Sequence, residues 1–384
     1  MNPMLPVPSA DALAHSQRVA AHLRSLIAAA GGWVPFSRYM EAALYAPGLG
    51  YYAAGAAKFG AAGDFVTAPE LTPLFGRTLA HAIAPVLAAT GGEVLELGAG
   101  SGKLAADVLG ELERLGALPA RYAILDVSAD LRERQQAALT RAVPHLAERV
   151  QWLDALPARF TGVILGNEVL DALPAEMVHW TDAGPQVRGV VAAGDGFAWQ
   201  DRSIADPVLR ARAEALDRVP DYVSEINLAA DALIASLAAS LDRGLILMID
   251  YGFAASEYYH PQRHMGTLRA HYRHHALDDP FYLPGLCDLT AHVDFSAVAR
   301  AGMAAGLTLA GFTSQAGFLL NSGLTELLMQ TPPTDAAAYL PQANAVQRLV
   351  SPAEMGELFK VIGLARGEVP PLAGFARGDR QHTL

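Results

Sequence analysis

The sequence predicts an α/β fold built on a parallel sheet. From Gly91 onward, short apolar segments alternate with segments of helical periodicity, as in parallel strands joined by crossover helices. At the centre is the segment 93–103, EVLELGAGSGK, in which a short apolar strand turns through alternating glycines directly into an amphipathic helix. Such a corner brings backbone N–H groups and a helix N-terminus close to a ligand. We therefore expect a nucleotide-type cofactor to bind there.

Length and composition are those of a protein with a large core. The chain has 384 residues, 52% of them hydrophobic and 17% charged, which is enough for one large domain or for two. Its net charge of −11 argues against a general nucleic-acid or anionic-membrane surface and is compatible with basic partners. The lone Cys287 allows no internal disulfide, which suits a reducing compartment, and the N-terminus lacks the features of a signal or transit peptide. We expect a cytoplasmic protein that binds neither nucleic acid nor membrane.

The spacing of the glycines distinguishes among known cofactor loops. The dinucleotide fingerprint is G-x-G-x-x-G, whereas Gly98, Gly100 and Gly102 form G-x-G-x-G. A phosphate-binding P-loop would need glycine, and serine or threonine, at two positions where this chain has leucine. With Glu96 two residues ahead, the pattern resembles the first motif of the class I methyltransferases that use S-adenosylmethionine (SAM). The alternative is a glycine-rich strand–helix corner that binds no ligand.

That resemblance implies SAM as the cofactor and a Rossmann-like fold with a mostly parallel, seven-stranded sheet. It also implies that the loop surrounds the methionine and ribose portion of SAM. The loop residues that we expect to bind the cofactor are Glu96, Gly98, Gly100, Ser101 and Gly102.

Acidic residues follow the next two predicted strands. Asp126 stands close to the end of the apolar segment 122–127, where an acidic residue binds the ribose hydroxyls in such folds. The alternative is a simple strand-end residue or helix cap. Asp154 follows the strand 150–153 and is expected beside the adenine.

The fourth strand carries the candidates for catalysis. Its apolar residues 163–165 suit a strand covered on both faces, and Asn167, Glu168 and Asp171 follow at the end where open α/β sheets place their ligands. The alternative interpretation is a capped helix start. Methyltransferases that act on amide or base nitrogens often carry N-P-P-Y here, whereas this chain has N-E-V-L, so that subclass is not expected.

Further elements surround this core. Residues 1–90 are expected to form an N-terminal helical cap with a cofactor-covering loop, in which Asp64 and Thr67 are candidates for contacting the ligand. The SAM-binding core is expected over 91–255, and β-like runs between glycine-rich turns predict an inserted antiparallel element at 177–204.

The segment 256–294 is rich in aromatic residues and histidines. No cysteine pair or H-E-x-x-H pattern accompanies the histidines, so we expect no metal. An insertion of this kind over the active site more often shapes access to it. Residues 295–384 are expected to complete the sheet.

Seven segments carry a more specific resemblance. They are RYMEAALYAPGLGYY, GDFVTAPELTPLFG, VLELGAGSGKLA, GNEVLDALPAE, IDYG, LTAHVDF and MGELFKVIGLARG. Together they resemble the MidA-like family of SAM-dependent protein arginine methyltransferases, the family of the mitochondrial complex I assembly factor. The match extends from about Phe36 to Gly367. One departure is Asp126, which stands where many relatives have Glu and shortens the reach of the carboxylate.

The resemblance implies methylation of an accessible arginine on a protein substrate. Carboxylates can clamp the planar guanidinium and orient one nitrogen, and methyl transfer depends mainly on positioning the nucleophile. We expect Glu168 and Asp171 to orient the arginine, with Asn167 directed towards the methionine end of SAM. Two alternatives are a small-molecule methyltransferase and a non-catalytic assembly factor that binds SAM. A homodimer is compatible with the sequence, although it shows no coiled coil.

Overall fold

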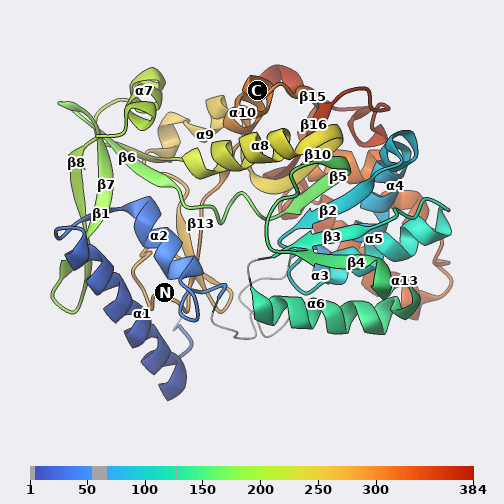
Figure 1. The fold of residues 1–384 in the computed structure, drawn as a ribbon, viewed down its shortest axis with the longest axis horizontal. Helices are drawn as coiled ribbons and strands as arrows, with labels where there is room; N and C mark the ends of the chain where they lie inside the picture. Colours follow the sequence, from blue (N-terminus) through green and yellow to red (C-terminus); the bar gives the residue numbers. More distant parts are fainter. Residues whose placement is uncertain (1–4, 54–66, 127) are drawn as a thin grey trace. The chain divides into compact units, whose positions relative to one another are not determined.

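The chain divides into two compact units. The computed structural model describes residues 5–53, 67–126 and 128–384 (Figure 1). The first unit comprises residues 1–65, 170–230 and 256–292, and the second comprises residues 66–169, 231–255 and 293–384. Each unit is therefore assembled from three segments that are far apart in the sequence.

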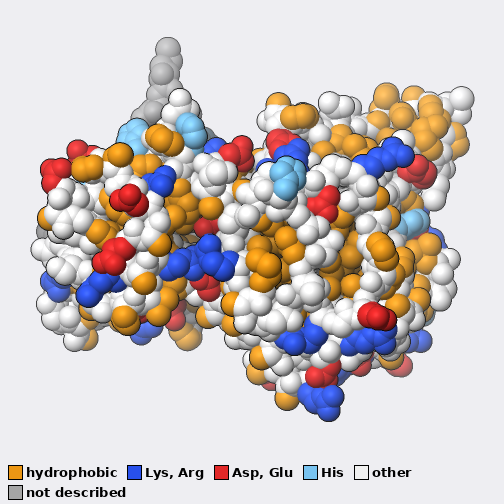
Figure 2. Space-filling view, turned by 90° about the horizontal axis from the view of Figure 1, so that it is seen from above, with side chains coloured by type: hydrophobic (Ala, Val, Ile, Leu, Met, Phe, Trp, Pro, Cys, Tyr) orange, Lys and Arg blue, Asp and Glu red, His pale blue; other side chains and the backbone are white. Residues whose placement is uncertain are grey.

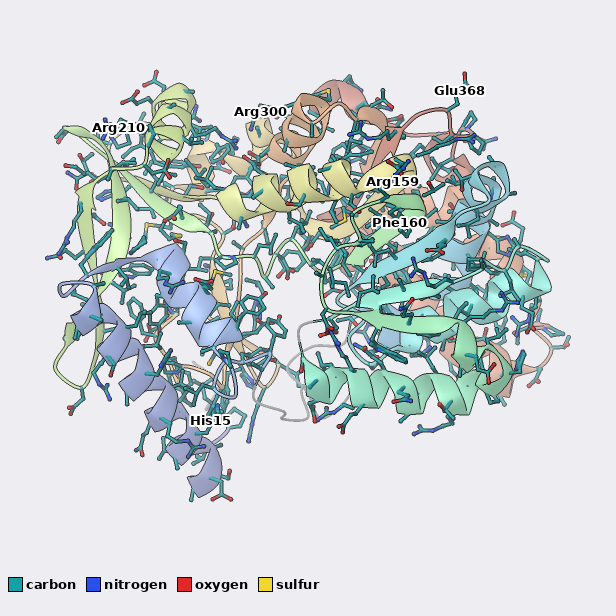
Figure 3. All side chains as sticks on the ribbon, in the orientation of Figure 1. His15, Arg159, Phe160, Arg210, Arg300 and Glu368 are labelled. Carbon is teal, nitrogen blue, oxygen red and sulfur yellow. The ribbon has the colours of Figure 1, made fainter. Side chains whose placement is uncertain are left out.

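The second unit is built on a mixed β-sheet. Within the described residues the sheet has eight strands, seven of which follow the order β15-β16-β10-β5-β2-β3-β4. Their bounds are β2 Glu93–Leu97, β3 Tyr122–Leu125, β4 Val150–Leu153, β5 Phe160–Asn167, β10 Leu241–Phe253, β15 Thr308–Ser314 and β16 Phe359–Arg366. β4, β3, β2, β5 and β10 are parallel, whereas β16 runs antiparallel to both of its neighbours. At the start of β5, Phe160 is buried and the exposed Arg159 pairs with Asp242 at 2.7 Å (Figure 3).

The eighth strand departs from the mostly parallel, seven-stranded sheet that we expected. β10 extends beyond the end of β5, and its last two residues pair in parallel with β14, Val293–Asp294. Gly252 permits this approach, since a Cβ there would collide with the carbonyl of Val293. A two-residue strand has no periodicity by which a sequence could reveal it. The α/β class is confirmed, but the sheet is mixed.

Helices pack around this sheet. They are α3 Ala68–Leu71, α4 Pro73–Thr90, α5 Lys103–Arg114, α6 Ala129–Ala142, α10 Phe295–Ala304, α11 Gln315–Asn321, α12 Leu324–Leu328, α13 Ala336–Val350 and α14 Met355–Leu358. α5 buries Leu104, Val108 and Leu112 on one face, as its periodicity predicted. Leu115 is the exposed C-cap, because the helix ends before Gly116.

The uncharged stretch between Arg300 and Glu326 forms the end of α10, then β15, α11 and the start of α12. Of the helices described, none combines the length and the apolarity that a membrane crossing requires.

The first unit combines the N-terminal helices with two antiparallel sheets. The larger sheet has the order β1-β7-β6-β9, with β8 paired to β7, and the smaller has the order β12-β11-β13. The bounds are α1 Ala10–Ala29, β1 Val34–Pro35, α2 Phe36–Tyr45, β6 Glu176–Thr181, β7 Gly184–Ala193, β8 Gly196–Ser203, α7 Pro207–Leu216, β9 Tyr222–Ile226, β11 Arg269–Tyr272, β12 His275–Leu277 and β13 Asp288–Thr290. Two helices join segments of different units along the chain, α8 Leu228–Ser240 and α9 Ala255–Tyr258.

The units group the segments differently from the boundaries expected. The N-terminal helices, the β element at 177–204 and most of 256–294 share one unit, because α1, α2, β6, β7 and β11 contribute to one apolar core. α4, expected in the cap, belongs to the second unit, where its Leu79, Ile83 and Val86 are buried and it packs on α5. Hydrophobic burial, and not order along the chain, therefore sets the grouping.

Candidate active site

The glycine loop between β2 and α5 has the backbone that its sequence requires. Gly98, Gly100 and Gly102 have φ of 60°, 54° and 82°, which favours glycine. A Cβ at Gly102 would lie 2.8 Å from the Cα of Gln135, so this glycine allows α5 to approach α6. A Cβ at Gly100 would meet no described atom within 4 Å. The loop therefore leaves open space at Gly100 for a ligand.

Glu96 lies beneath the loop, inside the sheet. Its carboxylate is buried and accepts a 2.6 Å hydrogen bond from the hydroxyl of Tyr122. Burial raises the pKa of Glu96 to about 7; the Tyr122 hydrogen bond opposes this and the charge of Asp126 adds to it. Glu96 is therefore buried in β2, just before the loop. Its contact with a cofactor stays a prediction.

The outer side of the loop faces α3. The hydroxyl of Ser101 donates to a carboxylate oxygen of Glu70, and it accepts the backbone N–H of Lys103 at 3.3 Å. Thr67 directly precedes α3 and is half-buried. Asp64, the other candidate from this segment, lies outside the described residues. The structure therefore brings a carboxylate, Glu70, to the loop that sequence reasoning did not select.

Asp126 belongs to a buried polar network centred on Gln135. One carboxylate oxygen of Asp126 accepts the backbone N–H of Ser128 at 2.9 Å, and the other accepts the side-chain amide of Gln135 at 2.8 Å. The same amide donates to the carbonyl of Gly100 at 3.2 Å, and the amide oxygen accepts the indole N–H of Trp152 at 2.8 Å. Gln135 therefore connects the ends of β3 and β4 to the glycine loop.

Asp154 lies at the end of β4 on the surface. Its side chain is 92% exposed and pairs with Arg132 at 2.7 Å. Arg132 also donates to the carbonyls of Asp126 and Leu153, so it ties together the ends of β3 and β4. Asp154 therefore stands at the predicted edge of the sheet, and its place beside an adenine stays a prediction.

A strained turn follows β5. Glu168 has a φ of 53°, a conformation that costs a non-glycine residue on the order of 1–3 kcal/mol and persists only when its surroundings impose it. Two backbone hydrogen bonds do so here: the N–H of Glu168 donates to the carbonyl of Ile249 at 2.9 Å, and the N–H of Val169 donates to the buried carboxylate of Asp250 at 3.1 Å. Strain of this kind is concentrated at functional sites.

The side chains of this turn are polar and adjacent. The amide nitrogen of Asn167 donates to the carboxylate of Glu168 at 3.2 Å. The amide oxygen of Asn167 is buried and accepts no hydrogen bond from the residues described. A buried acceptor without a donor is costly, so this atom suits a ligand that brings an N–H or O–H group.

Asp171, the third candidate for catalysis, belongs to the first unit. It is buried, and its carbonyl accepts the N–H of Ala291 at 3.0 Å. Nearby, the hydroxyl of Tyr52 donates to the carboxylate of Asp288 at 2.8 Å, and the ring of Tyr52 stacks on Tyr45 with centroids 5.5 Å apart. Burial raises the pKa of Tyr52, and the charges of Asp288 and Asp171 add to this. Sequence reasoning did not select Tyr45, Tyr52 or Asp288, whose spacing along the chain gives no signal.

The histidines of the segment 256–294 do not converge. Across the described part of the chain, no group of three His, Cys, Asp or Glu side chains is placed to hold a metal ion. His271 is half-buried in β11, and burial, together with the charge of Arg269, lowers its pKa to about 4. His275 interacts instead with the backbone carbonyl of Arg273.

Comparison with known families identifies the cofactor of this chain. Residues 78–313 match the model of a family described as S-adenosyl-L-methionine-dependent methyltransferases. The chain belongs to this methyltransferase family. SAM is its cofactor, and the MidA-like resemblance is confirmed.

Solved structures and curated relatives agree with the assignment. A protein from Burkholderia thailandensis, crystallised with S-adenosyl-homocysteine, is 54% identical with a TM-score of 0.96, covering 99% of this chain and 100% of that one. A native crystal structure of a protein from Burkholderia thailandensis is also 54% identical, with a TM-score of 0.94. The mitochondrial protein arginine methyltransferase NDUFAF7 of Danio rerio is 28% identical over 94% of this chain and 92% of that protein. The human protein of the same name is 28% identical over 87% and 80%.

The residues present fit this cofactor. The open space at Gly100 admits a ligand close to the backbone, and the buried amide oxygen of Asn167 calls for a donor that the described residues do not supply. Asp126, at the end of β3, holds its carboxylate in a fixed orientation through Gln135 and Ser128. SAM consists of a methionine portion and a nucleoside with a ribose. Backbone, amide and carboxylate groups can form hydrogen bonds with the amino-acid and hydroxyl groups of these portions.

Proposed function

We propose that this methyltransferase modifies arginine side chains of a protein substrate. The curated relatives that carry the name protein arginine methyltransferase align through segments of both units, and not through the SAM-binding sheet alone. The observation that carries the proposal is the strained Glu168, a carboxylate held at the end of β5 beside Asn167. A carboxylate held in this way suits a cationic substrate.

We also propose the class I, Rossmann-like arrangement for the second unit. Five parallel strands in the order β10-β5-β2-β3-β4 support it, with β2 and its glycine loop inside the sheet. In such sheets the ligand binds beyond the carboxyl ends of the strands. The glycine loop and Asp126 follow such ends, and Asn167 is the last residue of β5.

The cofactor site consists of groups that the chain holds in place before binding. When bound, SAM supplies a methyl group that its sulfonium centre makes electrophilic. The glycine loop would hold the methionine portion, Asp126 the ribose hydroxyls, and the amide oxygen of Asn167 a donor at the methionine end. Gln135 keeps two of these groups in register, because its amide binds both Gly100 and Asp126.

Glu168 would orient the substrate. A guanidinium presents N–H donors in a rigid fork, and a carboxylate accepts two of them side by side. The backbone of Glu168 is fixed by Ile249 and its side chain by Asn167, so a nitrogen held by Glu168 loses little further freedom on binding. Asp171 stays the second carboxylate that the sequence predicts to hold the arginine.

Transfer of labelled methyl groups tests the proposal. Purified protein, SAM labelled in its methyl group and an extract of cells that lack this protein are incubated together, and label is counted in the protein and small-molecule fractions. We expect label in protein with the wild type and none with Glu168→Ala that still binds SAM. Label confined to small molecules would overturn the protein substrate, and SAM binding without any transfer would favour a non-catalytic assembly factor.

The cellular compartment and the assembly state stay predictions. We propose a cytoplasmic protein, supported by the lone Cys287, which allows no internal disulfide, whereas the curated relatives are named as mitochondrial. On the face shown in Figure 2, lysine and arginine side chains are interspersed with aspartate and glutamate. The expectation of no nucleic-acid or membrane partner, and the compatibility with a homodimer, carry over unchanged from the sequence.

A further inference from the structure

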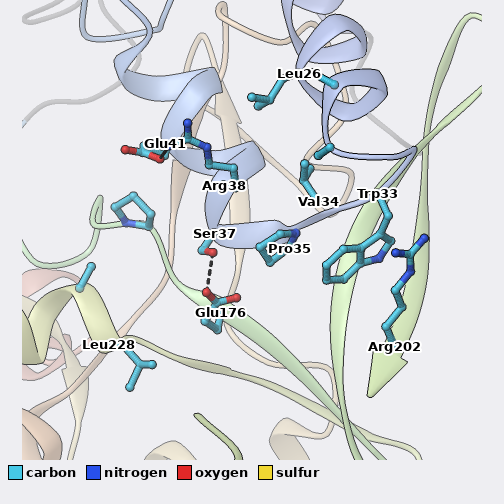
Figure 4. Close-up of a pocket in the computed structure, with 14 residues that line it drawn as sticks. Leu26, Trp33, Val34, Pro35, Ser37, Arg38, Glu41, Glu176, Arg202 and Leu228 are labelled. Carbon is cyan, nitrogen blue, oxygen red and sulfur yellow. Dashed lines mark hydrogen bonds and ion pairs between the residues drawn. The ribbon is translucent and has the colours of Figure 1, made fainter. Parts of the chain in front are cut away.

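The first unit contains a second site, a pocket of about 910 Å³ (Figure 4). It is lined by the end of α1, by β1 and α2, and by the starts of β6 and α8. Its volume is within the range of roughly 300–1,000 Å³ that is usual for pockets that bind ligands. None of the residues proposed to bind SAM lines it. The pocket therefore shares no residue with the proposed cofactor site.

Glu176 is a carboxylate of this pocket with a buried oxygen that has no hydrogen-bond donor among the residues described. One of its carboxylate oxygens accepts a 2.6 Å hydrogen bond from the hydroxyl of Ser37, as Figure 4 shows. The other oxygen is buried and accepts no hydrogen bond from the residues described. Burial raises the pKa of Glu176; the Ser37 hydrogen bond opposes this shift and the charge of Asp206 adds to it. The second oxygen lacks the donor that a buried acceptor needs.

The other charged groups of the pocket already have partners. Arg38 pairs with Glu41 at 2.5 Å, and both side chains are about half exposed. The guanidinium of Arg202 lies 4.8 Å from the centroid of the Trp33 ring. Neither arginine therefore forms an ion pair with Glu176 among the residues described, although both line the same pocket.

The remaining walls are apolar. They include Leu26, Val34, Pro35, Pro174 and Leu228. A small, strongly hydrated cation would gain nothing from these walls. A basic side chain carried by a short apolar stretch of polypeptide would use both features, because its apolar neighbours cover the walls while its head group reaches the carboxylate.

We propose that this pocket binds an arginine or lysine side chain of the protein substrate, presented by a short apolar segment, with the second carboxylate oxygen of Glu176 as its acceptor. The proposal rests on the proposed function, since it assumes a protein substrate, and it adds a docking site apart from the reacting arginine. The charged head group pairs with Glu176, and the flanking residues contact the apolar walls. Substrates that carry such a segment would be bound in preference to those with an isolated arginine.

Direct binding tests this site without methyl transfer. The probe is the peptide acetyl-Leu-Ala-Arg-Ala-Leu-amide, titrated calorimetrically into the full-length protein. We expect the Kd to rise at least ~10-fold when citrulline, the neutral analogue, replaces the arginine, because a charge-assisted hydrogen bond to Glu176 is lost. Glu176→Gln should produce a similar rise, while its amide oxygen still accepts the Ser37 hydrogen bond. The matched control is Glu214→Gln, an exposed position on α7 that does not line the pocket.

Each outcome is decisive for the pocket. Equal binding of the arginine and citrulline peptides, or unchanged binding to Glu176→Gln, would overturn the acceptor assigned to Glu176. N-acetylarginine methylamide carries the arginine without the flanking residues. If it binds as tightly as the peptide, the flanking apolar segment does not contribute to binding, and the pocket is a small-molecule site. Since no SAM is present, these results are independent of the transfer assay: failure to form methylarginine would overturn the proposed function and leave the measured pocket affinity standing.

Discussion

The side-chain amide of Gln135 donates a 2.8 Å hydrogen bond to the carboxylate of Asp126, directly after β3. The same nitrogen reaches the carbonyl of Gly100 at 3.2 Å, and the amide oxygen accepts from Trp152. A single buried side chain thus fixes the groups proposed to bind opposite portions of the cofactor. Networks of this kind are stable only when every member is satisfied.

Replacing Gln135 by leucine should weaken SAM binding. The change leaves the Trp152 N–H and one oxygen of Asp126 without their partner, at a cost of about 1–3 kcal/mol for each buried group. We expect the Kd for SAM to rise at least ~10-fold, with a lower melting temperature. Gln136→Leu is the matched control, since the neighbouring Gln136 is exposed. Equal SAM affinity of the two variants would contradict the positioning assigned to Gln135.

Replacing Gly100 by valine should abolish SAM binding by filling the open space beside the loop. The valine would also be strained at a φ of 54°. Gly116→Val separates the two effects, because Gly116 has a φ of 64° and equally open surroundings but lies at the end of α5. Both variants should lose stability, and calorimetry should show lost SAM binding in Gly100→Val alone. Retained affinity in that variant would refute the loop assignment.

Two substitutions of Glu168 should both lower the rate of methyl transfer but differ in their effect on the free energy of unfolding. Glu168→Gln removes the carboxylate charge, so we expect the transfer rate to fall ~100-fold, as for a misplaced nucleophile, while the Kd for SAM stays unchanged. Glu168→Gly should also lose transfer, yet it relieves the left-handed strain and should raise the free energy of unfolding by about 1 kcal/mol. Denaturant titration and single-turnover assays would measure both effects. Full transfer by Glu168→Gln would remove Glu168 from the mechanism.

The buried Glu96 should make stability depend on pH. Its pKa is raised from 4.5 to about 7 in the folded protein, so the folded state holds a proton that the unfolded state releases. This contribution is fully present below pH ~4.5 and is lost as the pH rises through about 7, which amounts to about 3 kcal/mol. Glu96→Gln should therefore flatten the decline in unfolding free energy between pH 5 and pH 8, whereas the exposed Glu133→Gln should not. Parallel profiles for Glu96→Gln and wild type would contradict the raised pKa.

Local sequence predicted the glycine loop well, because the backbone geometry of the loop dictates its residues. Gly98, Gly100 and Gly102 stand at positive φ, and such positions can be recognised because few other residues tolerate them. Asn167 and Glu168 could be selected because they follow an apolar strand. Gln135 could not, because it lies in a helix rich in charged residues and its burial depends on packing against Gly102.

The antiparallel element at 177–204 was predicted, but the assembly of the first unit was not, for a different reason. Its sheets pair residues far apart in the chain, as when Val34 of β1 pairs with Val190 of β7. Neither partner carries a local signal for the other, since antiparallel pairing depends on tertiary packing. Segments expected as separate insertions therefore share one core, and the pocket around Glu176 forms from them.

Amino-acid analysis of methylated protein tests the central claim most directly. Protein labelled by the purified enzyme and methyl-labelled SAM is hydrolysed, and the labelled amino acid is identified by chromatography against standards. The account predicts label in methylarginine with the wild type, and none with Gly100→Val or Glu168→Ala. Label in any other amino acid, formed by the wild type and lost in Gly100→Val, would contradict arginine as the substrate while leaving SAM-dependent methyl transfer established.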